Sequence, residues 1–153
     1  MSVMPGPEWF DSRVTLAINL QLKPGRHGAS ARVEMHPRND GIVAVVLVRG
    51  RLDRVALRRL AQTLEDLAAR GVRRLLLDCS QLRDIRLGLV SPLMDSLARF
   101  ESRVGRYAVC GLSQHLRDRF RYAGCETDLH SRTSAADLLA FPLALGPSGE
   151  WVS

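Results

Sequence analysis

The chain has 153 residues, 46% of them hydrophobic and 25% charged, which is the size and composition of one globular domain. No segment approaches the roughly 18 apolar residues of a membrane span, and the N-terminus lacks the pattern of a signal sequence, so we expect a cytoplasmic protein without membrane insertion. The net charge is +6, and every basic residue except Lys23 is an arginine. Because these arginines are scattered and aromatic residues make up only 5%, nucleic-acid binding is not expected.

The cysteines Cys79, Cys110 and Cys125 form no paired motif. Neither a disulfide framework nor a metal site is therefore expected, and buried apolar positions are the simplest interpretation. The histidines accompany no nucleophile motif, and no glycine-rich phosphate loop is present. The sequence thus predicts no enzyme and no cofactor.

Residues 1–30 are interpreted as an N-terminal extension with one probable strand over residues 14–22, where apolar and polar side chains alternate. The same alternation over 31–36 predicts a second, short strand. Residues 37–41 have the composition of a tight turn, which leads into the apolar run 42–48. That run suits a central strand covered on both faces.

Helices and strands then alternate along the chain. Asp53 has the position of a helix N-cap, and Gly71 that of the stop at the end of the same helix. Residues 74–79 and 107–112 predict two further strands, and Ser113 caps a helix that ends at Gly124.

After that helix, residues 127–130 predict a short strand, and Ser134 with Asp137 resembles a capping box. Residues 142–153 are rich in proline and glycine and are interpreted as a C-terminal tail. The order of the elements predicts an α/β fold with a mixed sheet and covering helices.

Residues 84–90 are predicted to form a loop before a helix. Ser91 and Pro92 have the chemistry of an N-cap and first helical residue, which favours a helix that begins near Pro92. The alternative helix begins at Arg86, uses Asp84 as its N-cap and carries Pro92 in its second turn, where proline would kink the axis.

Three motifs in this order resemble the STAS domain, the family of sulfate transporters and anti-sigma-factor antagonists. They are Gly-Arg-Leu-Asp at 50–53, Leu-Leu-Asp-Cys-Ser at 76–80 and Gly-Leu-Ser at 111–113. The resemblance covers residues 31–141 and implies a STAS-like mixed sheet with covering helices. The strand at 14–22 is additional, and it could extend the sheet edge or pair with a second copy in a homodimer.

In anti-sigma-factor antagonists the loop before the second helix reads Asp-Ser-Ser-Gly-Leu or Asp-Ser-Thr-Gly-Leu and carries the phosphorylated hydroxyl. Here Ile85, Arg86 and Leu87 precede Gly88 and Leu89, so no phosphoacceptor is expected at Arg86 or Leu87. The resemblance implies a non-enzymatic regulatory module that binds an anti-sigma factor, which is also a GHKL-type kinase. The expected partner-binding residues are Asp84, Ile85, Arg86, Leu87, Gly88, Leu89 and Ser91.

Two alternatives stay open. The chain could be the STAS subunit of an ABC transporter of the lipid-transport type, bound to its ATPase, or part of a signalling complex. It could also bind an anion or nucleotide through Arg86 and the helix start, because helix N-termini favour negative charge. Asp53 and Asp78 are interpreted as structural residues and not as a catalytic carboxylate pair.

Overall fold

A computed structural model of the chain describes residues 16–39, 41–103 and 105–126. Within these residues five strands form one sheet in the order β1-β2-β3-β4-β5. β2 is antiparallel to both β1 and β3, whereas β3, β4 and β5 run parallel to one another. The predicted α/β fold with a mixed sheet is therefore confirmed. The elements are β1 (Leu16–Lys23), β2 (Ala29–Arg38), β3 (Gly41–Leu52), α1 (Arg54–Ala69), β4 (Val72–Ile85), α2 (Leu87–Arg103), β5 (Arg106–Cys110) and α3 (Gln114–Tyr122).

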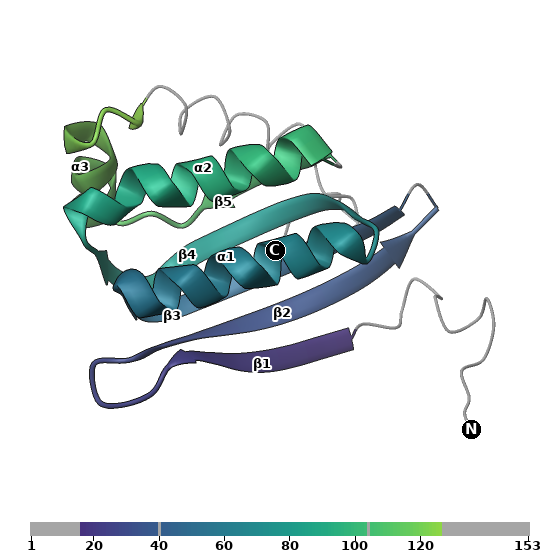
Figure 1. Cartoon of the computed structure of the whole chain (residues 1–153), viewed down its shortest axis with the longest axis horizontal. Coiled ribbons are helices and arrows are strands. Elements are labelled where there is room, and N and C mark those ends of the chain that lie inside the picture. The colour runs from purple at the N-terminus through teal and green to yellow at the C-terminus, as the bar shows by residue number, and fades with distance from the viewer. Residues whose placement is uncertain (1–15, 40, 104, 127–153) are drawn as a thin grey trace.

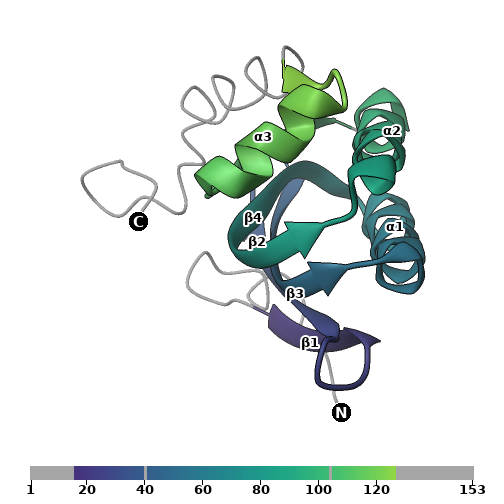
Figure 2. The same ribbon diagram turned by 90° about the vertical axis from the view of Figure 1, so that its left-hand side faces the viewer.

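The helices α1 and α2 lie side by side on one face of the sheet (Figure 1). Seen from the end, α3 lies beside α2 where the parallel strands finish (Figure 2). Each parallel strand leads directly into a helix, so the starts of all three helices gather at the carboxyl end of the sheet. In open α/β sheets this end is the usual place for a binding site.

The core lies between the sheet and the helices. Alternate residues of the central strands point into it, such as Val46 in β3 and Leu77 in β4, which occupy facing positions. On the opposite face Val43 and Leu76 are also buried, whereas Val45 and Leu47 are half-buried. The prediction of a central strand covered on both faces thus holds only in part.

The predicted N-terminal strand is present as β1, which extends the sheet edge by pairing with β2 of the same chain. Its side chain Leu22 is 1% exposed and belongs to the core, whereas Ile18 is 44% exposed. Self-association through this edge strand stays a prediction.

The predicted helix caps are confirmed. The Asp53 carboxylate accepts a hydrogen bond from the Ala56 amide at 2.9 Å, and the Ser113 hydroxyl accepts one from the Leu116 amide at 3.2 Å. Gly71, which follows the C-cap residue Arg70 of α1, has φ +92°, a conformation that glycine adopts without strain.

Several strands are longer than predicted. β2 includes Pro37, a residue of the predicted turn, β3 continues to Leu52, and β4 continues six residues past Cys79 to Ile85. In β4 the extra residues pair with the end of β3, so neighbouring backbone groups compensate for their weak strand propensity. The predicted strand at 127–130, the capping box at Ser134 and both tails lie outside the described residues.

Candidate functional site

The segment between β4 and α2 is shorter than the sequence predicts. β4 ends at Ile85 and α2 begins at Leu87, so the expected loop over 84–90 is wrong. Ser91 is not an N-cap and Pro92 is not a first helical residue, because both lie inside α2. The alternative helix start at Arg86 is correct within one residue, but Asp84 lies in the strand and does not cap the helix.

The buried face of α2 explains this start. Val90 and Leu93 are both almost completely buried, and they share the helix face that continues to Leu97. If the helix began at Pro92, Val90 would lie outside the helix and could not be part of this buried face. Pro92 lacks an N–H, so the Gly88 carbonyl, four residues earlier, loses its usual helical donor.

The residues around the helix start differ in exposure. Arg86, Gly88 and Ser91 are exposed, and the Leu87 side chain is 42% exposed although it is large and apolar. We call Arg86, Leu87, Gly88 and Ser91 the α2-start surface. A Cβ atom added at Gly88 would meet no heavy atom within 4 Å, so the backbone is open to approach at this point.

The other expected partner-binding residues lie behind this surface. Leu89 is half-buried and packs against the core. Ile85 is fully buried in the core, so its side chain is not available for contact with a partner. Sequence periodicity alone did not reveal this, because Ile85 falls at the end of the unexpected extension of β4.

A groove between α1 and α2 opens beside the α2-start surface. This α1–α2 groove has a volume of about 460 Å³ and is mainly basic at its rim. Of the lining residues within the described part of the chain, Asp95 alone is acidic. Its lining residues are Arg54, Leu57, Arg58 and Ala61 from α1, and Gly88, Leu89, Pro92, Asp95, Ser96 and Arg99 from α2.

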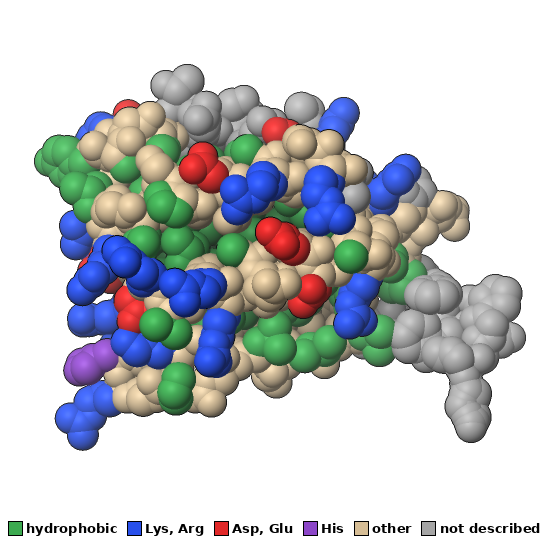
Figure 3. Space-filling model, viewed as in Figure 1, with side chains coloured by type: hydrophobic (Ala, Val, Ile, Leu, Met, Phe, Trp, Pro, Cys, Tyr) green, Lys and Arg blue, Asp and Glu red, His purple; other side chains and the backbone are tan. Residues whose placement is uncertain are grey.

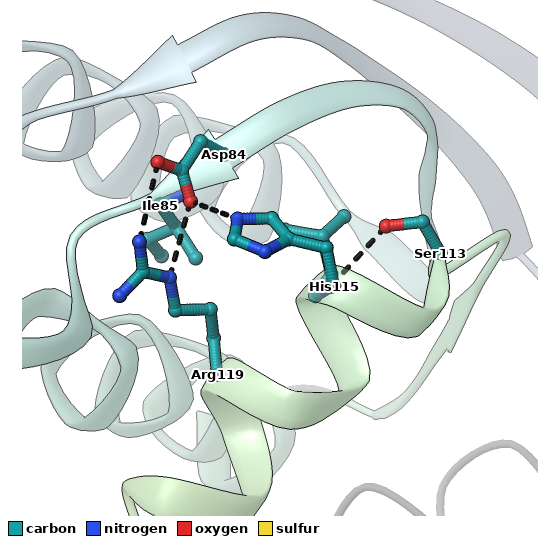
Figure 4. A network of polar contacts seen from close by, with 6 residues as sticks. Asp84, Ile85, Ser113, His115 and Arg119 are labelled. Atoms are coloured by element: carbon teal, nitrogen blue, oxygen red, sulfur yellow. Dashed lines mark hydrogen bonds and ion pairs between the residues drawn. The ribbon is translucent and has the colours of Figure 1, made fainter.

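Asp84 joins the end of β4 to α3 (Figure 4). Its carboxylate oxygen Oδ1 lies 2.7 Å from Nε2 of His115 and accepts a hydrogen bond from Nε of Arg119 at 3.2 Å. Both partners come from α3, four residues apart, which places them on one face of that helix. The same Oδ1 accepts the amide of Ile85 at 2.9 Å.

Partial burial of Asp84 acts to raise the pKa of its carboxyl. The hydrogen bonds from His115 and Ile85 and the charge of Arg119 outweigh this effect, and they hold the pKa below its usual value. Sequence reasoning missed this cluster. The spacing of His115 and Arg119 on one helix face was visible, but their partner is distant in sequence.

The remaining chemical candidates are structural. Asp53 accepts hydrogen bonds from the Ala56 amide and from Lys23, which hold the pKa of its carboxyl below the ordinary value. Asp78 is not at a strand end, but it is the last β4 residue paired with β5, and its carboxylate accepts the Ser80 amide at 2.9 Å. Burial raises the pKa of the Cys110 thiol to about 12, which disfavours its reactive thiolate.

Two solved structures are similar to this fold. The anti-sigma factor antagonist SpoIIAA in its unphosphorylated form is 17% identical, with a TM-score of 0.51 over 62% of this chain and 83% of that one. An anti-sigma factor antagonist from Mycobacterium paratuberculosis is 19% identical, with a TM-score of 0.53 over 74% of this chain and 97% of that one. At such identities the likeness defines the class of fold, which is the SpoIIAA-like α/β domain.

The sequence model of one protein family, described as "Mlab, STAS domain", matches residues 35–138. The chain therefore belongs to the STAS domain family, as its three motifs predicted. β1 lies outside the matched residues. The comparison with curated proteins found no match. Among the described helices, none combines the length and apolar character needed to cross a membrane.

Proposed function

We propose that the chain is a non-enzymatic protein-interaction module that binds its partner through the α2-start surface without a phosphorylation switch at Arg86 or Leu87. The observation that carries this proposal is the exposed Leu87 between Arg86 and Gly88, at the place where related domains carry their regulatory loop. When a partner covers a large exposed apolar side chain, apolar surface is removed from water, and this stabilises the complex. Arg86 supplies a permanent positive charge beside it.

The absence of a hydroxyl group at Arg86 and Leu87 supports constitutive binding. Phosphorylation would add about two negative charges at this helix start, and neither side chain can accept it. Ser91 is the nearest hydroxyl of the surface, one helical turn beyond Leu87, and it is exposed. Ser91 lies inside α2 and does not cap the helix, so it is the hydroxyl at which a displaced switch would be sought.

Phosphopeptide mapping tests the constitutive part of the proposal. After incubation with ATP and a GHKL-type kinase, we expect no phosphopeptide from the segment 84–96. A phosphate on Ser91 would contradict constitutive binding and indicate a displaced switch.

Two partner classes fit the proposal. The first is an anti-sigma factor of the GHKL-kinase type, in line with the fold of the two similar structures. The second is the ATPase of a lipid-transport ABC transporter, which the STAS resemblance of the sequence also implies. In either case the proposed contact is apolar at Leu87 and basic at Arg86.

Affinity capture followed by mass spectrometry distinguishes the two classes. The tagged full chain is compared with Leu87→Glu, and with Ile18→Glu as a control, because Ile18 is 44% exposed on the distant edge strand. We expect a GHKL-type kinase or an ABC ATPase with the wild type and the control, and at least a tenfold loss with Leu87→Glu. Recovery of neither class, or equal capture by all three chains, would contradict the proposal.

A further inference from the structure

A second basic feature lies at the carboxyl end of the sheet, apart from the α2-start surface. Four arginines line a pocket of about 310 Å³ between the β1–β2 connection and the ends of β3 and β4. We call Arg26, Arg49, Arg51 and Arg83, with His27 and Gln81, the arginine pocket. Figure 3 shows Lys and Arg side chains crowded over the end of the molecule that holds this connection and the start of α1.

The strands place these arginines together. Arg49 and Arg51 are two residues apart in β3, and both line the pocket although the β3–β4 register shifts between Gly50 and Arg51. Gln81 is the register partner of Arg49 in β4, and Arg83 follows two residues later. Gln81 and Arg83 flank the buried Leu82, and both are exposed and line the pocket.

The β1–β2 connection closes the pocket by a close backbone approach. A Cβ atom at Gly50 would lie 2.2 Å from the Gly28 carbonyl oxygen, so only glycine permits this contact. The same oxygen accepts a hydrogen bond from the Arg51 amide at 3.2 Å. Arg26 and His27 are thereby held over the ends of β3 and β4.

No acidic side chain is found among the described residues that line the pocket. Within the described residues, none of the four arginines has a hydrogen-bond or ion-pair partner for its side chain. Two carboxylates lie close to these arginines in the chain, Asp53 directly after β3 and Asp84 within β4, next to Arg83. Both are engaged with other partners, Asp53 with Lys23 and Asp84 with His115 and Arg119. Like charges grouped without counter-charges repel one another, and a bound anion would relieve that repulsion.

The geometry points to a binding site for a compact oligophosphate, meaning a small molecule with two or more adjacent phosphate groups. Guanidinium groups bind phosphate oxygens through paired hydrogen bonds, and four of them match several charges. The volume is at the lower end of the range for small-molecule sites. Because the described lining residues include no Phe, Tyr or Trp, they offer no platform on which nucleic-acid bases could stack.

Calorimetric titration of the full chain tests the site, and it does not depend on the proposed protein partner. The probes are orthophosphate, pyrophosphate, tripolyphosphate and ATP at physiological salt. We expect pyrophosphate and tripolyphosphate to bind at least tenfold more tightly than orthophosphate. If ATP binds as tightly as tripolyphosphate, the phosphate chain alone is recognised. If ATP binds more tightly, the nucleoside contributes to binding as well.

Paired variants locate the site. Arg49→Gln with Arg83→Gln should weaken pyrophosphate binding at least tenfold. The control pair, Arg59→Gln with Arg117→Gln, removes the same amount of charge from exposed helix positions. It should change the affinity for pyrophosphate less than twofold. Equal losses in both variants would mean non-specific attraction, and would overturn the proposal.

Amide chemical shifts of the wild type provide a readout that needs no variant. On addition of pyrophosphate, the Gly28 and Gly50 amide signals should move, whereas that of Gly88 should stay in place. No saturable shift with any phosphate probe would overturn the proposal. Shifts with an acidic peptide alone would overturn it in favour of a protein-binding surface.

Discussion

The carboxylate of Asp84 at the end of β4 lies 2.7 Å from Nε2 of His115 on α3. This contact, with the ion pair to Arg119, ties the residue that precedes the α2-start surface to a helix far along the chain. The start of α2 is thus positioned from two sides, by β4 and by α3. Stiffening of this kind reduces the entropy that a partner must remove when it binds.

The Asp84 cluster is expected to stabilise the fold modestly, because its side chains are about one-third or more exposed. We expect His115→Ala to lower the free energy of unfolding by about 0.5 kcal/mol, and Asp84→Ala, which removes the acceptor shared by His115, Arg119 and the Ile85 amide, by about 1–2 kcal/mol. Urea denaturation measures both. Gln114→Ala is the control on the same helix and should cost less than about 0.5 kcal/mol. A larger loss for His115→Ala than for Asp84→Ala would contradict this account of the cluster.

Stability should fall in acid. The pKa values of Asp53 and Asp84 are both lowered in the folded chain. Their contribution is therefore present above the unfolded pKa of about 3.9 and is lost as the pH falls through the folded values. Denaturation from pH 6 to pH 2 should show this decline, with a shallower slope in Asp53→Asn and Asp84→Asn. Slopes identical to that of the wild type would show that neither group is linked to folding.

Two glycines with the same backbone conformation should respond differently to substitution. Gly50 and Gly71 have φ values of +91° and +92°, but only Gly50 has backbone atoms within 4 Å of an added Cβ. Gly71→Ala should cost about 1 kcal/mol from strain alone, and Gly50→Ala more than about 3 kcal/mol or the fold itself. Thermal unfolding compares them. Equal losses of stability in the two variants would mean that the β1–β2 connection moves to accommodate the new side chain, and that Gly28 is not held against β3.

β1 should behave as part of the cooperative fold. Leu22→Ala should lower the free energy of unfolding by about 2–4 kcal/mol, since its side chain is 1% exposed in the core. Ile18→Ala, at 44% exposure, should cost less than about 1 kcal/mol. Chemical denaturation distinguishes the two. Small and equal effects would show that β1 folds independently of the domain.

Sequence patterns predicted the structure correctly where the deciding contacts join residues that are close in the sequence. The cap residues Asp53 and Ser113 bind amides three residues ahead, so their types and positions predict the helix starts. The same reasoning failed at Ser91 and Pro92. Their local preference for a helix start was overridden by the burial of Val90 and Leu93, which requires an earlier helix start.

The sequence by itself determined the order of the elements, the family and the absence of a hydroxyl at Arg86 and Leu87, because periodicity, motif order and residue type are properties of the chain. Only the tertiary structure decided where β4 ends and α2 begins, since pairing with β3 and burial in the core outweigh local preference. It also brought together Asp84 with His115, and Arg49 with Arg83. Long-range contacts depend on sheet register and helix placement, which cannot be inferred from the sequence pattern alone.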